Sequence, residues 1–368
     1  MKIMYVFGTR PETVKLTPLI KKTKHPVVCV TGQHREMLHQ TLKLFKVKPS
    51  YDLKVMKKGQ TLGFLTASLI AKLEPVMKKE KPDVVVVQGD TTSSFAGALS
   101  AFYQKIPVAH VEAGLRTENK YEPFPEEIYR RLITQTADLF FPPTKESAKI
   151  LLDEGIERKR VVVTGNTGID ALMMRQKEIK KDSRKYWEYF GENYGIVSHP
   201  RMILVTGHRR ENFGAGMKEI CLALRDVAKK EDVLIVYPVH LNPNVQQPVK
   251  EILGGISNVK LIPPQDYNNF LHLMYNSFFI ITDSGGVQEE APSLGKPLLV
   301  MRNVTERPEG VAAGNAVLVG TDRKKIASWS RKLLHDKRVY GRMSHAGNPY
   351  GDGKASARIL KAIYRFFR

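Results

Sequence analysis

Three carboxylates in the first half of the chain follow apolar segments or a stiff loop in a way that suits acid–base chemistry. The segment 106–111 leads directly into Glu112, and a stiff Pro-Phe-Pro loop then leads to Glu126. Asp90 follows the apolar segment 83–89 and, taken alone, would be read as the N-cap of a helix. Because three carboxylates gather near neighbouring strand ends, we interpret them as candidates for removing and returning a proton.

A second group of residues has the features of an anion site. Ser284, Gly285 and Gly286 follow the apolar segment 278–282 and precede a helical pattern. Such a turn leaves backbone N–H groups free at a helix N-terminus, where glycine lets a phosphate approach closely, although an ordinary tight turn is the alternative. Glu290, one helical turn later, either accepts hydrogen bonds from a ribose diol or faces solvent.

Basic side chains follow other apolar segments. Arg10 comes after the first of them, and Arg10 and Lys15 could clamp phosphate oxygens, with a surface lysine as the alternative for Lys15. His208 lies beside two arginines after the first apolar segment of the second half, where it could hydrogen-bond a leaving phosphate. Arg307 is a further phosphate partner, or belongs to a surface loop.

Motifs for several other kinds of chemistry are missing. The sequence contains no G-x-G-x-x-G, no P-loop lysine motif and no G-x-S-x-G elbow. Its ten histidines show no metal-ligand spacing. Neither a nicotinamide cofactor nor a metal ion has support from the sequence.

Short apolar runs alternate with amphipathic stretches along the whole chain, which predicts an α/β fold with parallel sheets. The helical stretches include 35–45, 61–80 and 92–103. The predicted strands are MKIMYVFG, VVCVTG, DVVVVQG, PVAHVE and RVVVTG in the first half, and RMILVTG, DVLIVYPV, NVKLIPP, FFIITD and PLLVM in the second. Because the halves repeat one scheme, we expect two Rossmann-like doubly wound domains.

The join between the domains is expected near residues 166–170, which gives domains 1–168 and 169–354. The stretch 176–199 is expected to open the second domain as a helix, and the helix 355–368 to pack back on the first domain. Ligands of parallel sheets bind beyond the carboxyl ends of the strands, so the cleft between the two domains is the expected site.

Composition excludes several classes of protein. With 368 residues and 42% apolar residues the chain is globular, and no apolar run approaches the roughly 20 residues of a membrane span. The only two cysteines, Cys29 and Cys221, are far apart, which favours a reducing, cytoplasmic location. The net charge of +21 comes largely from scattered lysines, so we expect a small phosphorylated ligand rather than nucleic acid.

The motifs taken together resemble a known family. FGTRPE, GQHREML, GDTTSS, HVEAGLRT, PFPEE, TGNTGIDAL, GHRRENFG, TDSGGVQEEAPSLGKPLLVMR and ERPEG occur in this order. This set resembles the non-hydrolysing UDP-N-acetylglucosamine 2-epimerases over nearly the whole chain. The resemblance implies two Rossmann-like domains in the GT-B arrangement, a homodimer in the cytoplasm, and interconversion of UDP-GlcNAc and UDP-ManNAc without a redox cofactor or metal.

Carried over motif by motif, the resemblance implies roles for individual residues. Those that look catalytic are Asp90, Glu112, Glu126 and His208. Those that look like contacts to the UDP group are Arg10, Lys15, Gln265, Phe270, Ser284, Gly285, Gly286, Glu290 and Arg307. Gln33 and His34 match a second, activating UDP-GlcNAc site, but Ser68 stands where an arginine is expected, so activation is not predicted.

Chemistry gives an independent reason for such a set. The C2 proton of the sugar is inert until UDP leaves C1, and basic groups that stabilise the departing diphosphate therefore make that proton removable. Two alternatives use a similar site: a GT-B glycosyltransferase and a hydrolysing epimerase. A nucleic-acid-binding protein is a third alternative, from another class.

Overall fold

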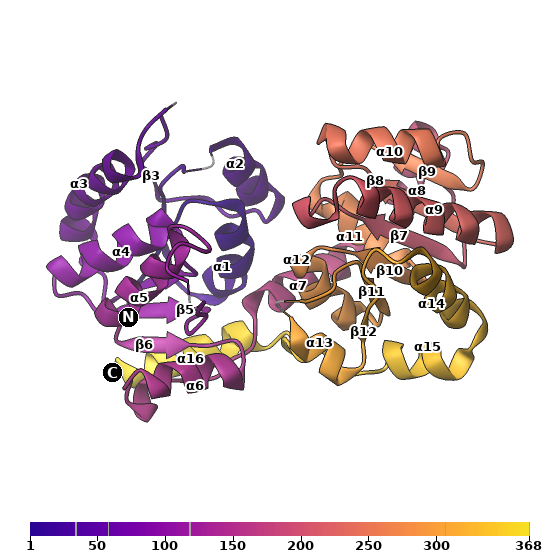
Figure 1. Ribbon diagram of the computed structural model, residues 1–368. Helices are drawn as coiled ribbons and strands as arrows, with labels where there is room; N and C mark the ends of the chain where they lie inside the picture. Colours follow the sequence, from indigo (N-terminus) through magenta and orange to yellow (C-terminus); the bar gives the residue numbers. More distant parts are fainter. Residues whose placement is uncertain (34, 58, 118, 306, 368) are drawn as a thin grey trace. The chain divides into compact units, whose positions relative to one another are not determined.

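The computed structural model describes residues 1–33, 35–57, 59–117, 119–305 and 307–367 (Figure 1). Contacts divide the chain into two compact units: Met1–Ala171 with Gly351–Arg368, and Leu172–Tyr350. Each unit contains one six-stranded parallel sheet covered by helices.

The first unit is built around the sheet β3-β2-β1-β4-β5-β6. Its strands are β1 Ile3–Phe7, β2 Val27–Val30, β3 Tyr51–Asp52, β4 Val84–Gln88, β5 Val108–Val111 and β6 Leu139–Phe141. Its helices are α1 Arg10–Lys22, α2 Arg35–Leu44, α3 Leu62–Glu80, α4 Thr92–Tyr103, α5 Glu126–Thr136, α6 Lys145–Asp153 and α16 Ala355–Phe366.

The second unit repeats the topology with the sheet β12-β11-β10-β7-β8-β9. Its strands are β7 Met202–Thr206, β8 Leu234–Pro238, β9 Val259–Ile262, β10 Phe279–Thr282, β11 Leu298–Val300 and β12 Ala316–Leu318. Its helices include α8 Ser183–Tyr194, α9 Ala215–Lys230, α10 Pro243–Leu253, α11 Tyr267–Asn276, α12 Gly285–Glu290, α13 Pro308–Ala313, α14 Arg323–His335 and α15 Lys337–Ser344. Helix α7, Thr167–Lys181, begins in the first unit and ends in the second.

The predicted fold class, α/β with two doubly wound parallel sheets, is confirmed. Counted from its first strand, each sheet has the order 3-2-1-4-5-6, in which the sheet is wound outward from its centre in both directions. Strands β1, β4 and β10 are buried along their whole length because helices cover both faces, which explains their unbroken apolar runs.

Two expectations about the elements were wrong. The run RVVVTG is not a strand, because only Val161 bridges Phe140 and the chain then turns through Gly165 toward α7. The single helix expected over 176–199 is divided between α7 and α8, and α8 ends at Gly195, whose left-handed backbone terminates helices.

The C-terminal helix α16 lies in the first unit, against α1 and β6 (Figure 1). The buried carboxylate of Asp170 accepts hydrogen bonds from the backbone N–H groups of Ala355 and Ser356, at 3.1 and 2.9 Å. Because these are the first two residues of α16, Asp170 caps the helix from a distant part of the chain. No helix within the described ranges is both long and apolar enough for a bilayer span.

Candidate active site

Glu112 stands at the carboxyl end of β5 in an unusual backbone conformation. Its φ of 65° lies in the left-handed region, which costs free energy for a residue with a side chain. Lys15 Nζ donates to one carboxylate oxygen at 2.5 Å, and the amide of Gln88 donates to the other. The strained turn and the two donors therefore hold the Glu112 carboxylate in one orientation.

Asp90 follows β4 and is paired with an arginine from α5. Arg130 Nε donates to Asp90 Oδ2 at 2.7 Å. Burial raises the pKa of Asp90, Arg130 opposes that rise, and the negative charges of Glu112 and Glu126 add to it. The N-cap of α4 is the neighbouring Thr91, so the Asp90 side chain is not used as a cap.

Glu126 is the first residue of α5, not a loop residue as expected from the sequence. Its Oε2 is buried and has no hydrogen-bond partner among the described residues. The next residue, Glu127, is fully buried and accepts hydrogen bonds from Thr117 N and Arg131 Nε, both at 2.9 Å. Glu127 thus fixes the start of α5, while Glu126 keeps an oxygen available.

In the second unit, a buried carboxylate organises the turn after β7. Asp283 Oδ2 accepts hydrogen bonds from the backbone N–H groups of His208 and Arg209, at 2.8 and 2.9 Å, and from the Asn212 amide at 3.2 Å. His208 Nδ1 lies 3.3 Å from Asp283 Oδ1 without hydrogen-bond geometry. Burial lowers the pKa of His208 despite the opposing Asp283 charge, which favours the neutral ring.

The Ser-Gly-Gly turn lies next to this histidine turn. Ser284 is the N-cap of α12, and the first N–H groups of a helix have no acceptor within it. A side chain at Gly285 would meet the guanidinium groups of Arg307 and Arg209, 3.7 and 3.9 Å from its Cβ. Two arginines, one of them paired with Glu289 at 2.6 Å, thus lie around a residue without a side chain at a helix N-terminus, an arrangement that suits a phosphate.

The remaining predicted residues of the second unit lie around α11 and the end of α12. Gln265 precedes α11 and donates to the Pro263 carbonyl at 2.7 Å. Phe270 is half-buried on α11 and packs against the core. Glu290 ends α12 and accepts from the Tyr267 hydroxyl at 3.4 Å.

The remaining predicted residues of the first unit are less closely connected. Arg10 is the half-buried first residue of α1. Gln33 accepts a hydrogen bond from the Ser93 hydroxyl at 2.9 Å, and Ser68 is half-buried on α3. His34 lies outside the described residues.

Sequence reasoning missed several residues of this arrangement. Gln88 and Arg130 orient the two central carboxylates, and Asp283 organises the histidine turn. One signal was available: Asp283 directly precedes the Ser-Gly-Gly turn after a buried strand. No group of three or more histidine, cysteine, aspartate or glutamate side chains within the described residues could hold a metal ion.

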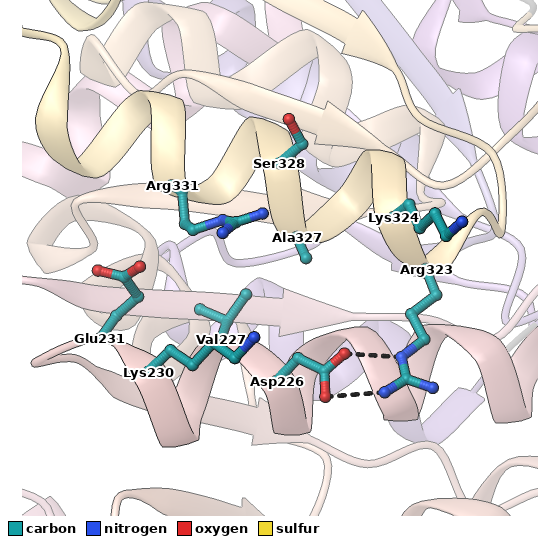
Figure 2. Close-up of a pocket in the computed structure, with 9 residues that line it drawn as sticks. All are labelled: Asp226, Val227, Lys230, Glu231, Arg323, Lys324, Ala327, Ser328 and Arg331. Carbon is teal, nitrogen blue, oxygen red and sulfur yellow. Dashed lines mark hydrogen bonds and ion pairs between the residues drawn. The ribbon is translucent and has the colours of Figure 1, made fainter.

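One well-defined cavity lies apart from the predicted residues (Figure 2). Its volume is about 470 Å³, between α9 and α14 of the second unit. Asp226 and Arg323 join the two helices through hydrogen bonds of 2.6 and 3.0 Å. None of the predicted site residues lines it, so the candidate site is defined by the strand ends and not by this hollow.

The chain has extensive similarity to characterised proteins. The family model of UDP-N-acetylglucosamine 2-epimerase matches residues 19–364. The UDP-N-acetylglucosamine 2-epimerase of Escherichia coli K12 is 52% identical over 370 residues, covering 99% of this chain and 98% of the relative. The Neisseria meningitidis UDP-GlcNAc 2-epimerase, solved bound to UDP-GlcNAc, shares 47% identity with a TM-score of 0.85, covering 99% of this chain and 100% of that chain. The Methanocaldococcus jannaschii UDP-GlcNAc 2-epimerase, in complex with UDP-GlcNAc and UDP, shares 35% identity with a TM-score of 0.75 and the same coverage.

Proposed function

The chain belongs to the UDP-N-acetylglucosamine 2-epimerase family, and we propose that it interconverts UDP-GlcNAc and UDP-ManNAc by inverting C2 of the sugar. The observation that carries this proposal is the constrained Glu112 carboxylate beside Asp90. Glu112 and Glu126 raise the pKa of Asp90 electrostatically, which places all three within the range of charge interaction. Such a group suits the transfer of a proton to and from carbon.

The proposed reaction is an elimination followed by an addition. A carboxylate takes the C2 proton, the C–H electron pair forms a C1=C2 double bond, and the C1–O bond breaks so that UDP leaves with its electron pair. The products are a carboxylic acid, 2-acetamidoglucal and UDP. Return of a proton to the opposite face of C2 and of UDP to C1 completes the epimerisation. No electrons are gained or lost, so the step needs no redox cofactor.

Glu112 is the candidate base whose hydrogen bonds the substrate can change. Lys15 donates to Glu112, and the resemblance directs Lys15, with Arg10, to the diphosphate. A diphosphate that draws the ammonium group toward itself removes this donor and leaves the carboxylate oxygen open to accept the proton. Asp90 and Glu126 are the candidates for delivering or accepting the proton on the other face.

We assign the uracil contacts, the ribose contacts and part of the diphosphate binding to the second unit. The turn Ser284–Gly286 and Arg307 are proposed to bind the diphosphate, and neutral His208 to donate a hydrogen bond to it as it leaves. Gln265 and Phe270 are proposed to contact the uracil, and Glu290 the ribose. Gln33 and His34 are proposed to belong to a second UDP-GlcNAc site.

We also propose a cytoplasmic homodimer. Cys29 and Cys221 are both free and buried, as in proteins of reducing compartments. Phe102 and Tyr103 at the end of α4 are 56% and 59% exposed, and both line a hollow of about 610 Å³ with the end of α5. Exposed aromatic side chains around a hollow are typical of protein–protein contacts, so this face is the proposed dimer surface.

The reaction in deuterated water tests the proposed function. UDP-GlcNAc should yield UDP-ManNAc, and NMR should find one deuteron at C2 of both epimers. Glu112→Gln should reduce turnover by about 100-fold or more, because an amide cannot accept the proton. Glu74→Gln, an exposed glutamate on α3 paired with Lys78, is the control and should keep wild-type turnover.

Three outcomes would contradict the proposal. Retention of the original hydrogen at C2 would exclude the elimination. Free ManNAc and UDP as main products would indicate a hydrolysing enzyme. Absence of UDP-ManNAc without an acceptor would favour a glycosyltransferase.

A further inference from the structure

A buried glutamate that the proposed reaction does not use lies between the first turns of α1 and α4. Glu12 is only 1% exposed. Its Oε2 accepts hydrogen bonds from the backbone N–H groups of Gly8 and Thr9, at 2.9 and 2.7 Å. Its Oε1 lies 2.6 Å from the Thr91 hydroxyl and 2.7 Å from the Ser94 hydroxyl. Among the described residues, these polar neighbours of the carboxylate are thus backbone N–H groups and hydroxyls, which are able to donate to it.

These contacts join two turns that carry predicted site residues. Gly8 and Thr9 precede Arg10 at the start of α1, and Thr91 follows Asp90 at the start of α4. The Ser94 hydroxyl also lies 2.5 Å from the Gln88 carbonyl oxygen, and the Gln88 side chain donates to Glu112. The Glu12 side chain therefore connects the Arg10 turn with Thr91 and Ser94 after Asp90 and, through Ser94, with Gln88 before it.

The surroundings leave little freedom for the two turns to move separately. A Cβ atom on Gly8 would lie 2.0 Å from the Thr31 hydroxyl and 2.3 Å from the Ser93 hydroxyl, so the turns meet without space for a side chain. Burial raises the pKa of Glu12, and the hydrogen bonds from Thr91, Gly8, Ser94 and Thr9 oppose that rise. The first turns of α1 and α4 add two helix N-termini, which favour a carboxylate.

We propose that Glu12 is a positioning residue that fixes the Arg10 turn relative to the Asp90 turn, and so sets the distance between diphosphate contacts and proton-transfer groups. This inference rests on the proposed function. The length of the side chain matters because one carboxylate oxygen caps α1 while the other contacts α4. A shorter side chain can keep the first contact and must give up the second.

Two substitutions of Glu12 separate the effect of side-chain length from the effect of charge. In Glu12→Asp the carboxylate can still accept from Gly8 and Thr9 but is one methylene too short for Thr91 and Ser94. Small misplacements of reacting groups have large kinetic effects, so kcat should fall by about 10- to 100-fold. In Glu12→Gln the full length remains, and the hydroxyls can rotate to accept from the amide. Its kcat should stay within about threefold of wild type.

Asp170→Asn is the matched control, because Asp170 is also a buried carboxylate that caps a helix of the first unit. It should lower the melting temperature while kcat for UDP-GlcNAc stays unchanged. Kinetics are measured well below each melting temperature, with circular dichroism verifying the fold. Wild-type kcat in Glu12→Asp, or an equal loss in Glu12→Gln and Glu12→Asp, would overturn the inference. A wild-type protein that exchanges no hydrogen at C2 would instead overturn the proposed function.

Discussion

The pKa of Asp90 depends on burial and on three charged neighbours. Burial raises its pKa, the nearby charges of Glu112 and Glu126 act in the same direction, and only Arg130 acts against them. Arg130 is 15% exposed at its side chain and contacts Asp90 at 2.7 Å, so solvent screens this pair weakly. The arginine therefore keeps Asp90 ionised to a lower pH than its site would otherwise allow.

Arg130→Met should raise the lowest pH at which the enzyme remains active. Loss of the guanidinium removes the group that lowers the pKa of Asp90, so Asp90 should protonate at higher pH. We expect kcat/KM near pH 6 to fall by about tenfold relative to wild type, with recovery toward pH 9. Profiles of kcat/KM against pH measure this.

Arg131→Met, the neighbour that contacts Glu127 and not Asp90, is the matched control. It should leave the acid limb of the profile in place. An unchanged acid limb in Arg130→Met would show that Asp90 does not set it.

The sequence identified site residues that directly follow a strand. It missed residues whose role depends on a contact with another element. Asp90 and Glu112 follow buried strands, so the sequence identified both. Gln88 looks like the last residue of a strand and Arg130 like a helix-surface arginine. Their contacts depend on how β4, β5 and α5 pack, which no local pattern reveals.

At the scale of elements, the packing of α8 against α11 buries a histidine among aromatic rings. His272 is fully buried, stacked on Tyr186 at 5.0 Å and in edge contact with Trp187 at 4.7 Å. Burial lowers its pKa to about 4. Because the folded-state pKa lies below the unfolded value of 6.5, the stabilising contribution is complete above pH 6.5 and is lost as pH falls toward 4.

His272→Phe should make the second unit less sensitive to acid. For the wild type, His272 should lower the free energy of unfolding by about 2 kcal/mol between pH 7.5 and pH 5. Phenylalanine keeps the ring stack and cannot take up a proton, so that loss should disappear. Urea unfolding followed by Trp187 fluorescence, in a Trp329→Phe background, measures the difference.

His110 has a similarly lowered pKa in the first unit and stays in both proteins, so it does not affect the comparison. The same pH dependence in wild type and His272→Phe would show that His272 does not titrate in this range.

Long, strongly patterned elements were predictable, whereas three of the shortest strands were missed. The helices expected over 61–80 and 92–103 correspond closely to α3 and α4. Strands β3, β6 and β12 are edge strands of only two or three residues, too few to show a pattern. The predicted RVVVTG strand failed for the opposite reason: its apolar pattern is clear, but only Val161 finds a partner.

At the scale of the whole molecule, the repeated sequence scheme correctly indicated repeated architecture. Both sheets have the same strand order, and in both the predicted site residues follow strands: central ones such as β4 and β10 and, for Gln265, the edge strand β9. Carboxylates dominate these positions in the first unit, and basic groups with glycines dominate in the second. The same topology therefore presents different side-chain chemistry in its two copies, a difference that propensity alone would not predict.

At this scale, the exposed face of α4 and α5 leads to a prediction about the oligomeric state. Phe102 and Tyr103 cost free energy in water if nothing covers them, and a second copy of the chain would bury both at once. The double substitution Phe102→Asp/Tyr103→Asp should convert the proposed dimer into a monomer, measured by size-exclusion chromatography with light scattering. Its melting temperature should then vary less with protein concentration, because folding is no longer linked to association.

Val197→Asp, at a 68% exposed apolar residue of the second unit, is the control and should remain dimeric. A monomeric wild type would contradict the dimer itself. A double variant that remains dimeric would show that the subunits meet on another face. Since charge repulsion between aspartates at a two-fold interface weakens with salt, partial recovery of the dimer at high ionic strength is expected if the face is correctly assigned.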